Sequence, residues 1–593
     1  MNILGISGLE QSEPFKRAQW PGLEEREYRM CQGYDAAAAL VSDGVVVAAA
    51  AEERFNRHKH SGAFPAGAIH YCLSHAGLKI RDIDGLAHAF NYAPYAAAYG
   101  TDPMARQRYR DVYSKDALLA LVQRELPAFP QERVCQIPHH LAHAASAYYT
   151  SGWDECLVVV IDGMGEVHST SAYHARGGTL QSLGHLSAYD SIGILYSLVT
   201  FHLGFDFNSD EYKIMGLAPY GDPQRFARFF EDAVKLREDG TIHIPLLRLN
   251  RTRDEREHHL RSRAYLAEHL IPPRHPDQTL TDEHRDAAAA LQACLNRTLQ
   301  HVCGHFGAKT GLRRLALAGG VALNCTANGA LMRAGRFDAL YVQPAAGDDG
   351  AALGAAFVRA SETGTVRNER FAVPYLGPSY HRTDIDRAVA AYRDQIVTTE
   401  MKTLEEACTA AATRIADGEV LAWYRGRMEF GPRALGHRSI LADPGHPDMR
   451  DRINAMVKKR EAFRPFAPAV SLEQAHEWFD LPPLTELPYM IMTVDVRPQF
   501  RACLPAITHI DGSARVQTVS ARNDMEFHTL LRAVGKTTGR EMVLNTSFNV
   551  KGQAIVNTPD EAIETFLRTS VDALFLEHML IRRRQHEDHQ EAT

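Results

Sequence analysis

The most informative strand in this sequence is Cys156-Leu157-Val158-Val159-Val160-Ile161-Asp162-Gly163, an apolar run that ends in a carboxylate and a glycine. Such a run predicts a buried strand, and the glycine predicts a turn directly after it. Ahead of it, His139-His140-Leu141-Ala142-His143 places two histidines four residues apart, on one face of a helix. Two imidazoles and a carboxylate that converge at one strand end indicate an incomplete metal site.

A fourth ligand is available far downstream, in Gly347-Asp348-Asp349-Gly350. Two histidines and two aspartates suit a mononuclear divalent ion such as Fe(II), Mn(II) or Zn(II). The alternative interpretation is an ordinary pair of helix histidines, with the aspartates as caps that complement a helix dipole. The presence of all four groups in one chain favours one of the two aspartates as a ligand.

The strand plan around the first run occurs twice in the sequence. In each copy a strand is followed by a polar loop and then by two strands around a short turn, and Asp43-Gly44 is a strong hairpin signal in the first copy. The predicted strands are 3–7, 36–42 and 45–51, and then 156–162, 169–174 and 180–186. The repeat predicts an internally duplicated fold, which is how actin-like ATPases hold a nucleotide between their halves.

Two further stretches suit a nucleotide. Gly319-Gly320 follows a predicted strand at 315–318, so the backbone there can approach an anion closely. Asn324 either contacts the nucleotide or caps the next helix. Glu211 is a candidate partner for ribose hydroxyls, with a plain surface turn as the alternative.

Composition bounds the class of protein. The 593 residues are 45% hydrophobic and 23% charged, and the length allows about three to four domain-sized units. The net charge of -7 argues against a general nucleic-acid or membrane binder. Nine cysteines without a CxxC motif fit a reducing compartment, and no apolar stretch reaches the ~20 residues of a membrane helix. We therefore expect a cytoplasmic, multidomain α/β protein.

The chain changes character twice along its length. Residues 225–285 are charged and irregular, which predicts a surface insertion that shapes an acceptor pocket. A boundary is expected at 361–378, after which a helix at 404–416 and a strand at 420–424 begin a new α/β unit.

The densest signal in the second half is basic. Ten lysines and arginines lie between positions 425 and 464, against five carboxylates. Arginine binds phosphate through two parallel hydrogen bonds and lysine supplies a compact charge, so the cluster predicts a phosphorylated small ligand. RNA is less favoured, because few aromatic residues are available for stacking.

Taken together, these motifs resemble the ATP-dependent O-carbamoyltransferases of nodulation-factor and antibiotic biosynthesis. The resemblance extends over essentially the whole chain. It is carried by Ala51-Glu52-Glu53-Arg54-Phe55, by 139–143, 215–221 and 319–324, by Arg427-Met428-Glu429-Phe430-Gly431-Pro432-Arg433-Ala434-Leu435-Gly436, by Phe463-Arg464-Pro465-Phe466-Ala467-Pro468, by Ala514-Arg515-Val516-Gln517-Thr518 and by 544–549.

The resemblance implies a duplicated actin-like (ASKHA) N-terminal domain over 1–365, with the insertion at about 225–285, and a YrdC-like α/β domain over 370–593. It implies that the C-terminal domain makes carbamoyl-adenylate from carbamoyl phosphate and Mg-ATP. The N-terminal domain, holding Fe(II) or another divalent metal, then transfers the carbamoyl group to a hydroxyl of a small molecule.

Site residues are implied by the same resemblance, position by position. The implied metal ligands are His139, His143, Asp162 and Asp348. Carbamoyl-adenylate is expected at Lys59, Gly193, Glu211, Gly320 and Asn324. Carbamoyl phosphate and ATP are expected at Arg433, Lys458, Arg464, Arg515 and Asn545.

One departure from the family concerns catalysis. The family usually has a histidine before the Asp-Ala of its first hairpin, whereas this chain has Tyr34-Asp35-Ala36. An unperturbed tyrosine titrates near ~10 and is a poor base at neutral pH. Tyr34 and Asp35 are the catalytic candidates, with Asp35 or a metal-bound group favoured as the base. The segment 10–29 ahead of them is also unusually long, and we expect it to remodel the acceptor site.

Other functions remain as alternatives. They are carbamoylation of a protein or a tRNA, and a non-catalytic actin-like nucleotide-binding scaffold. The absence of CxxC pairs disfavours hydrogenase maturation, and the negative net charge disfavours tRNA. The expected partner is a small hydroxyl acceptor, with no nucleic acid and no membrane, and a homodimer is left open.

Overall fold

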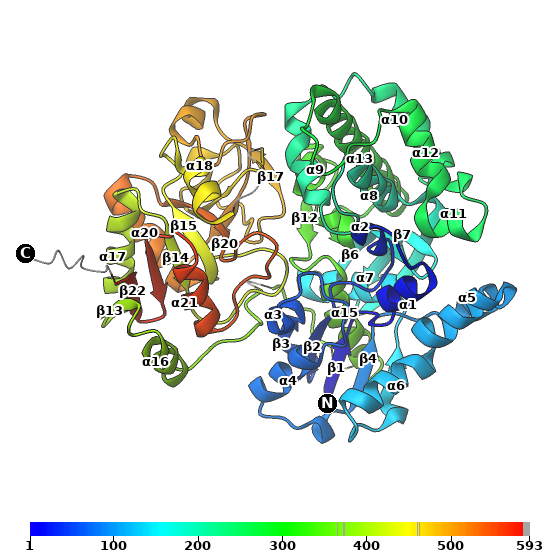
Figure 1. Cartoon of the computed structure of the whole chain (residues 1–593), viewed down its shortest axis with the longest axis horizontal. Helices are drawn as coiled ribbons and strands as arrows, with labels where there is room; N and C mark the ends of the chain where they lie inside the picture. The colour runs from blue at the N-terminus through cyan, green and yellow to red at the C-terminus, as the bar shows by residue number, and fades with distance from the viewer. Residues whose placement is uncertain (365, 372–373, 459–460, 462, 585–593) are drawn as a thin grey trace, which may run out of the picture. The chain divides into compact units, whose positions relative to one another are not determined.

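The computed structural model describes residues 1–364, 366–371, 374–458, 461 and 463–584, with helices and strands labelled in Figure 1. The chain divides into two compact units. Unit 1 comprises Met1–Pro374 with Phe430–Pro432 and Ile491–Thr493, and unit 2 comprises Tyr375–Glu429, Arg433–Met490 and Val494–Thr593. In the described part of the chain, no helix combines the length and the apolar character needed to cross a membrane.

Unit 1 contains two five-stranded sheets with the same strand order. The first runs β3-β2-β1-β4-β5 and the second runs β8-β7-β6-β11-β12. In each sheet the central strand pairs antiparallel with one strand of a hairpin on one side and parallel with one strand on the other, and that strand pairs parallel with the edge strand. The strands are β1 (Asn2–Ile6), β2 (Ala37–Ser42), β3 (Val45–Ala51), β4 (Gly85–His88), β5 (Val134–Gln136), β6 (Glu155–Gly165), β7 (His168–Arg176), β8 (Thr179–Ser187), β11 (Arg314–Ala318) and β12 (Ala339–Val342). The predicted duplication is confirmed.

Two helices pack against each other and against these sheets. Helix α7 (His139–Ser151) contacts β6 and β11, whereas α15 (Asp348–Ser361) contacts β1 and β2. Small residues allow the close approach, because a Cβ atom on Gly354 would lie 1.7 Å from the Ala142 carbonyl oxygen. The two helices lie side by side (Figure 1), and they bring His139 on one and Asp348 on the other to the same region.

Segment 10–29 and the insertion at 225–285 pack against each other within unit 1. Segment 10–29 forms α1 (Ser12–Gln19) and α2 (Glu25–Tyr28), and the insertion forms α10 (Ala227–Ala233), α11 (Arg253–His258) and α12 (Leu260–His269). Lys16, only 1% exposed, donates from Nζ to the carbonyl oxygens of Met30 at 2.8 Å and Glu257 at 3.1 Å. In addition, the Arg263 guanidinium pairs with Glu27 at 2.6 Å.

Four more helices of unit 1 lie before and after the insertion in the sequence. They are α8 (Ile192–His202), α9 (Glu211–Leu217) and the long α13 (Asp282–Thr310), followed after β11 by α14 (Cys325–Arg333). Helix α13 spans 29 residues. It begins after Thr281 with two acidic residues, which complement the helix dipole, and ends at Gly311 in the left-handed conformation.

Unit 2 is built on one mixed eight-stranded sheet. The strand order is β13-β22-β21-β14-β15-β20-β16-β19. The strands are β13 (Ile396–Glu400), β14 (Leu421–Tyr424), β15 (Arg438–Ala442), β16 (Ala467–Ser471), β19 (Gln517–Val519), β20 (Met542–Ser547), β21 (Ala573–Leu576) and β22 (Met579–Arg583). Helices α17 (Leu404–Ala416) and α20 (Met525–Thr538) pack on each other over its apolar core. The predicted fold class, a duplicated α/β domain followed by a further α/β domain, is confirmed.

Candidate functional site

Four predicted ligands come together in unit 1. His139 and His143 lie one turn apart on α7, Asp162 lies in the last part of β6, and Asp348 begins α15. Their ligand atoms all lie within 4.8 Å of one another. The Nε2 atoms of the two histidines are 3.0 Å apart, and His139 Nε2 lies 3.5 Å from Asp162 Oδ2 and 3.4 Å from Asp348 Oδ1.

These separations fit a shared cation. Ligand atoms at about 2.0–2.2 Å from one ion lie about 3–3.5 Å from each other in tetrahedral or octahedral sites. Two neutral Nε2 lone pairs facing each other at 3.0 Å would repel, whereas a cation between them satisfies both. The nitrogen and oxygen donors of this cluster therefore fit the divalent metal that the family resemblance implies.

The surroundings orient His139 for ligation. Its Nδ1 donates to the Ala89 carbonyl oxygen at 2.9 Å, which leaves the Nε2 lone pair facing the cluster. Its backbone N–H donates to Glu166 Oε1 at 3.0 Å, and the Phe90 ring stacks on the imidazole with centroids 4.2 Å apart. Both ligand histidines are fully buried, whereas the Asp348 side chain is 21% exposed.

Electrostatics in the cluster favour bound positive charge. Burial opposes ionisation of Asp162 and Asp348, but the imidazoles of His139 and His143 hold the pKa of each carboxyl below its ordinary value. Burial lowers the pKa of His139, yet the two carboxylates raise that pKa well above its ordinary value. A proton or a metal ion is therefore stabilised between these groups.

The glycines predicted for nucleotide binding lie at the same strand end. The register Val160–Ala318 places the loop after β11 beside the tip of β6, and the Gly320 N–H donates to Asp162 Oδ1 at 2.9 Å. A Cβ atom on Gly193, at the start of α8, would lie 2.7 Å from the Asp162 carbonyl oxygen. The carboxyl ends of parallel strands are where α/β sheets bind ligands.

The other predicted nucleotide residues have internal partners. Asn324 caps α14 through a bond from the Ala327 N–H at 2.9 Å, as the alternative interpretation predicted, and it also bonds Gln292. Glu211 accepts from Ser197 Oγ at 2.5 Å, and burial raises its pKa. Lys59 Nζ lies 5.3 Å from the centre of the Tyr212 ring.

The two catalytic candidates face different partners. The Tyr34 hydroxyl donates to Glu13 Oε2 at 2.9 Å, and burial raises its pKa, so it is not poised to accept a proton at neutral pH. Asp35 Oδ1 lies 2.8 Å from Nδ1 of His60, a histidine that the sequence patterns did not single out. In the sequence, what could have drawn attention to His60 is its position directly after Lys59, a predicted nucleotide-binding residue.

The predicted carbamoyl phosphate and ATP residues belong to unit 2. Asn545 on β20 donates to Gln517 Oε1 at 3.0 Å, and Gln517 Nε2 donates to the Leu435 carbonyl oxygen at 2.7 Å. This link joins the strand of Asn545 to the loop that follows Arg433 and to the segment that follows Arg515. Arg515 ends β18 (Ser513–Arg515).

Two more of these residues precede β16 in the sequence. Arg464 precedes β16 and pairs with Glu461 at 3.5 Å. The side chain of Lys458 lies outside the described part of the chain, although its backbone ends the segment Asn454–Lys458.

Sequence reasoning also missed a buried carboxylate that shapes the basic loop. Glu429 Oε1 accepts backbone N–H groups from Leu435 and His437, both at 2.8 Å, and from Arg438 at 3.1 Å. Without these bonds the loop would leave three amide donors unpaired. In the sequence, Glu429 was considered only as one of the five carboxylates among the ten basic residues of this region.

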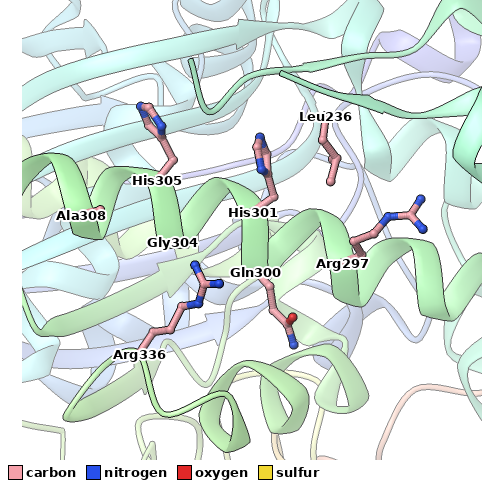
Figure 2. Close-up of a pocket in the computed structure, with 8 residues that line it drawn as sticks. All are labelled: Leu236, Arg297, Gln300, His301, Gly304, His305, Ala308 and Arg336. Carbon is pink, nitrogen blue, oxygen red and sulfur yellow. The ribbon is translucent and has the colours of Figure 1, made fainter. Parts of the chain in front are cut away.

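A separate pocket in unit 1 contains none of the predicted site residues. It has a volume of about 440 Å³ and lies along α13, lined by His301, His305, Arg297 and Arg336 among others. Figure 2 shows these side chains projecting from α13 and from the segment that carries Arg336. The chemistry described above is therefore not located in this pocket.

Comparison with known proteins identifies related sequences. The sequence model described as Carbamoyltransferase N-terminus matches residues 31–357, and that described as Carbamoyltransferase C-terminus matches residues 412–583. Nodulation protein NolNO of Sinorhizobium fredii is 41% identical over 557 residues, covering 93% of this chain and 79% of that protein. Nodulation protein NolO of Bradyrhizobium diazoefficiens is 40% identical over 449 residues, covering 75% of this chain and 79% of that protein. Among solved structures, component A of the Acidaminococcus fermentans (R)-2-hydroxyglutaryl-CoA dehydratase aligns with a TM-score of 0.31 and 14% identity over 61% of this chain and 99% of that chain.

Proposed function

This chain belongs to the carbamoyltransferase family, and on that premise we propose that it carbamoylates a hydroxyl group in two steps, the first of which consumes ATP. In the first step, carbamoyl phosphate, water and ATP give carbamoyl-adenylate, phosphate and pyrophosphate. In the second, the acceptor oxygen bonds to the carbamoyl carbon and AMP leaves with the electrons of the broken C–O bond.

We assign the first step to unit 2. Its two substrates carry several negative charges, and the unit supplies Arg433, Lys458, Arg464 and Arg515 to neutralise them. Asn545 and Gln517 add neutral donors beside the loop of Arg433. An arginine fork matches phosphate geometry better than a point charge, so the arginines orient the phosphates as well as attract them.

We assign the second step to unit 1. The lack of a side chain at Gly320 would let the adenylate approach the backbone next to Asp162, whose Oδ1 accepts the Gly320 N–H. His139, His143, Asp162 and Asp348 would hold a divalent ion such as Fe(II), which would neutralise phosphate charge or polarise the carbamoyl carbonyl. The apolar surroundings of the cluster, Phe90 among them, would keep water away from a labile mixed anhydride.

A single observation carries this assignment. The buried nitrogen and oxygen donors of α7, β6 and α15 meet at ion-sized separations, beside the glycines that end β11 and begin α8. In a family of carbamoyltransferases, a group of cation ligands beside glycine-rich backbone fits a nucleotide-activated carbamoyl donor. Two relatives are named nodulation proteins, and we propose a small-molecule hydroxyl acceptor in the cytoplasm for this chain as well.

The test is mass spectrometry of the purified full chain with ATP, Mg²⁺ and carbamoyl phosphate. We expect carbamoyl-adenylate and pyrophosphate. Arg515→Ala should abolish both products and leave the metal content unchanged, while Arg568→Ala, at an exposed arginine of the same unit, should behave as the parent protein. Undiminished pyrophosphate release by Arg515→Ala would contradict the assignment to unit 2, and no adenylate from the parent protein would contradict the proposed reaction.

A further inference from the structure

A histidine–aspartate pair lies in unit 1 outside the metal cluster. His60 Nδ1 is 2.8 Å from Asp35 Oδ1. The His60 backbone N–H donates to Glu53 Oε2 at 2.8 Å, and Glu53 Oε1 lies 2.8 Å from a guanidinium nitrogen of Arg54. One carboxylate thus holds the imidazole of His60 and a second holds its backbone.

This arrangement fixes the tautomer of His60. An ionised carboxylate only accepts hydrogen bonds, so the proton resides on Nδ1 and the lone pair on Nε2. Burial opposes ionisation of Asp35, but the His60 imidazole keeps the Asp35 pKa below its ordinary value. Nε2 is buried and has no hydrogen-bond partner among the residues that the structure describes. A hydroxyl donor would satisfy this nitrogen.

The backbone at both positions is unusual. Asp35 has a φ of +52° and His60 a φ of +57°, in the left-handed region that residues other than glycine rarely adopt. The two strained segments are tied together, because the Ala36 N–H donates to the Ser61 carbonyl oxygen at 2.7 Å. Such conformations persist where the surrounding structure holds them, and they concentrate at functional sites.

The pair neighbours the metal cluster and is open to solvent on one side. The charge of Asp348 is close enough to act on the ionisation of Asp35. The Asp35 side chain is 38% exposed and that of His60 is 22% exposed. A small molecule can therefore reach the exposed part of this pair, on which the charge of Asp348 from the cluster also acts.

The three side chains also form a group that is spatially able to bind a cation. Their existing bonds argue against that role. Both Glu53 oxygens are engaged, by Arg54 and by the His60 backbone, and Asp35 and His60 are bonded to each other. The geometry is that of a positioned imidazole.

We propose that His60 is the base that removes the proton from the acceptor hydroxyl, and that Asp35 is a positioning residue which orients the imidazole. This inference rests on the proposed function. The hydroxyl proton passes to Nε2 while the oxygen bonds to the carbamoyl carbon, and the C–O bond to AMP breaks. The imidazolium then returns its proton to the departing phosphate or to water. Asp35 stabilises the imidazolium while it exists.

The test uses two acceptor probes with ¹³C-labelled carbamoyl phosphate, ATP and Mg²⁺. Glycerol requires removal of a hydroxyl proton, whereas hydroxylamine attacks through an uncharged nitrogen and needs no base beforehand. We expect His60→Ala to form carbamoyl-adenylate and the hydroxylamine product normally but to lose glycerol carbamate by at least about a hundredfold, the usual contribution of a general base. Added imidazole should restore part of the glycerol reaction. His58→Ala, at the exposed histidine two residues earlier, is the matched control.

Each other outcome overturns a defined part of the inference. Normal glycerol transfer by His60→Ala contradicts the base, and an equal loss with both probes indicates a structural role. Loss of a bound metal equivalent from His60→Ala would identify the group as a cation site instead. A parent protein that forms carbamoyl-adenylate but carbamoylates neither probe contradicts the proposed transfer, and the role of His60 with it.

Discussion

The two halves of unit 1 have one strand order but differ in the connection that leaves their first strands. In the first half, β1 and β2 are separated by residues 7–36, which include α1, α2 and Asp35. In the second half, only Glu166 and Val167 separate β6 from β7. The second half instead places its long insertion between β8 and β11. The two halves therefore share a strand order but connect their strands by segments of different length.

This difference separates the chemistry. In the second half Asp162 lies on β6 itself, where the ladder to β7 is irregular, and α7 and α15 complete a cation cluster there. The long first-half connection brings Asp35 to His60 through strained backbone, which suits proton transfer. The duplication supplies the frame, and the connections supply the reactive groups.

The largest effect should result from removal of a ligand from the second-half cluster. His139→Ala leaves His143 and two carboxylates unable to hold the ion as tightly, so metal content should fall and transfer should drop more than the roughly 10–100-fold that loss of an outer-shell partner costs. Pyrophosphate release should persist, because we assign it to unit 2. Elemental analysis and product assays on one preparation check this, with His174→Ala as a control histidine on β7. Full transfer without bound metal would contradict the prediction that transfer depends on the metal cluster of the second half.

A smaller effect is expected at the glycines beside Asp162. Gly319 has a φ of +90°, and an added Cβ atom would lie 2.3 Å from the Ile161 carbonyl oxygen. Gly319→Ala should therefore lower the free energy of unfolding by about 3 kcal/mol, as measured by chemical denaturation. Gly320→Ala is the matched control, because its Cβ atom would meet only Asp162 Oδ1, at 3.1 Å. It should fold normally and weaken nucleotide binding, and equal stability loss in both variants would contradict this interpretation of the strand end.

The smallest effect concerns the first-half connection. Burial lowers the pKa of Lys16 to about 8. Below that pH both folded and unfolded chains hold the proton, and the cost of burying the charge is fully present. Above it the folded state loses the proton first, so stability should rise with pH, by about 2 kcal/mol between pH 8 and 9.5. Lys16→Met should lack this rise when the two proteins are unfolded side by side, and parallel pH curves would show that Lys16 is not the source.

Local patterns predicted much of this fold. The hairpin β2–β3 and helix α17 lie where alternation and apolar spacing placed them, because short-range signals determine such elements. The grouping of His139, His143 and Asp162 with one of the aspartates at 348–349 was likewise predicted from local patterns, and the family resemblance selected Asp348, which the structure places in the cluster.

The remainder depends on contacts that local patterns do not encode. His60 meets Asp35 only through left-handed backbone at both residues, which no periodicity signals. Gln517 joins Asn545 to the loop at Leu435 by pairing between distant strands. The contact of segment 10–29 with the insertion is also non-local, and the charged composition of both gave no indication that they pack together.

The buried amine of Lys16 has a consequence for motion. It bonds the carbonyl oxygen of Glu257, and the Glu257 carboxylate in turn pairs with Arg108. Separation of the two segments would break the Lys16–Glu257 bond and the Arg263–Glu27 pair, so the connection after β1 and the helices α11 and α12 should open together. Hydrogen exchange should therefore report one shared protection level for both segments, and a protease cut in one should expose the other.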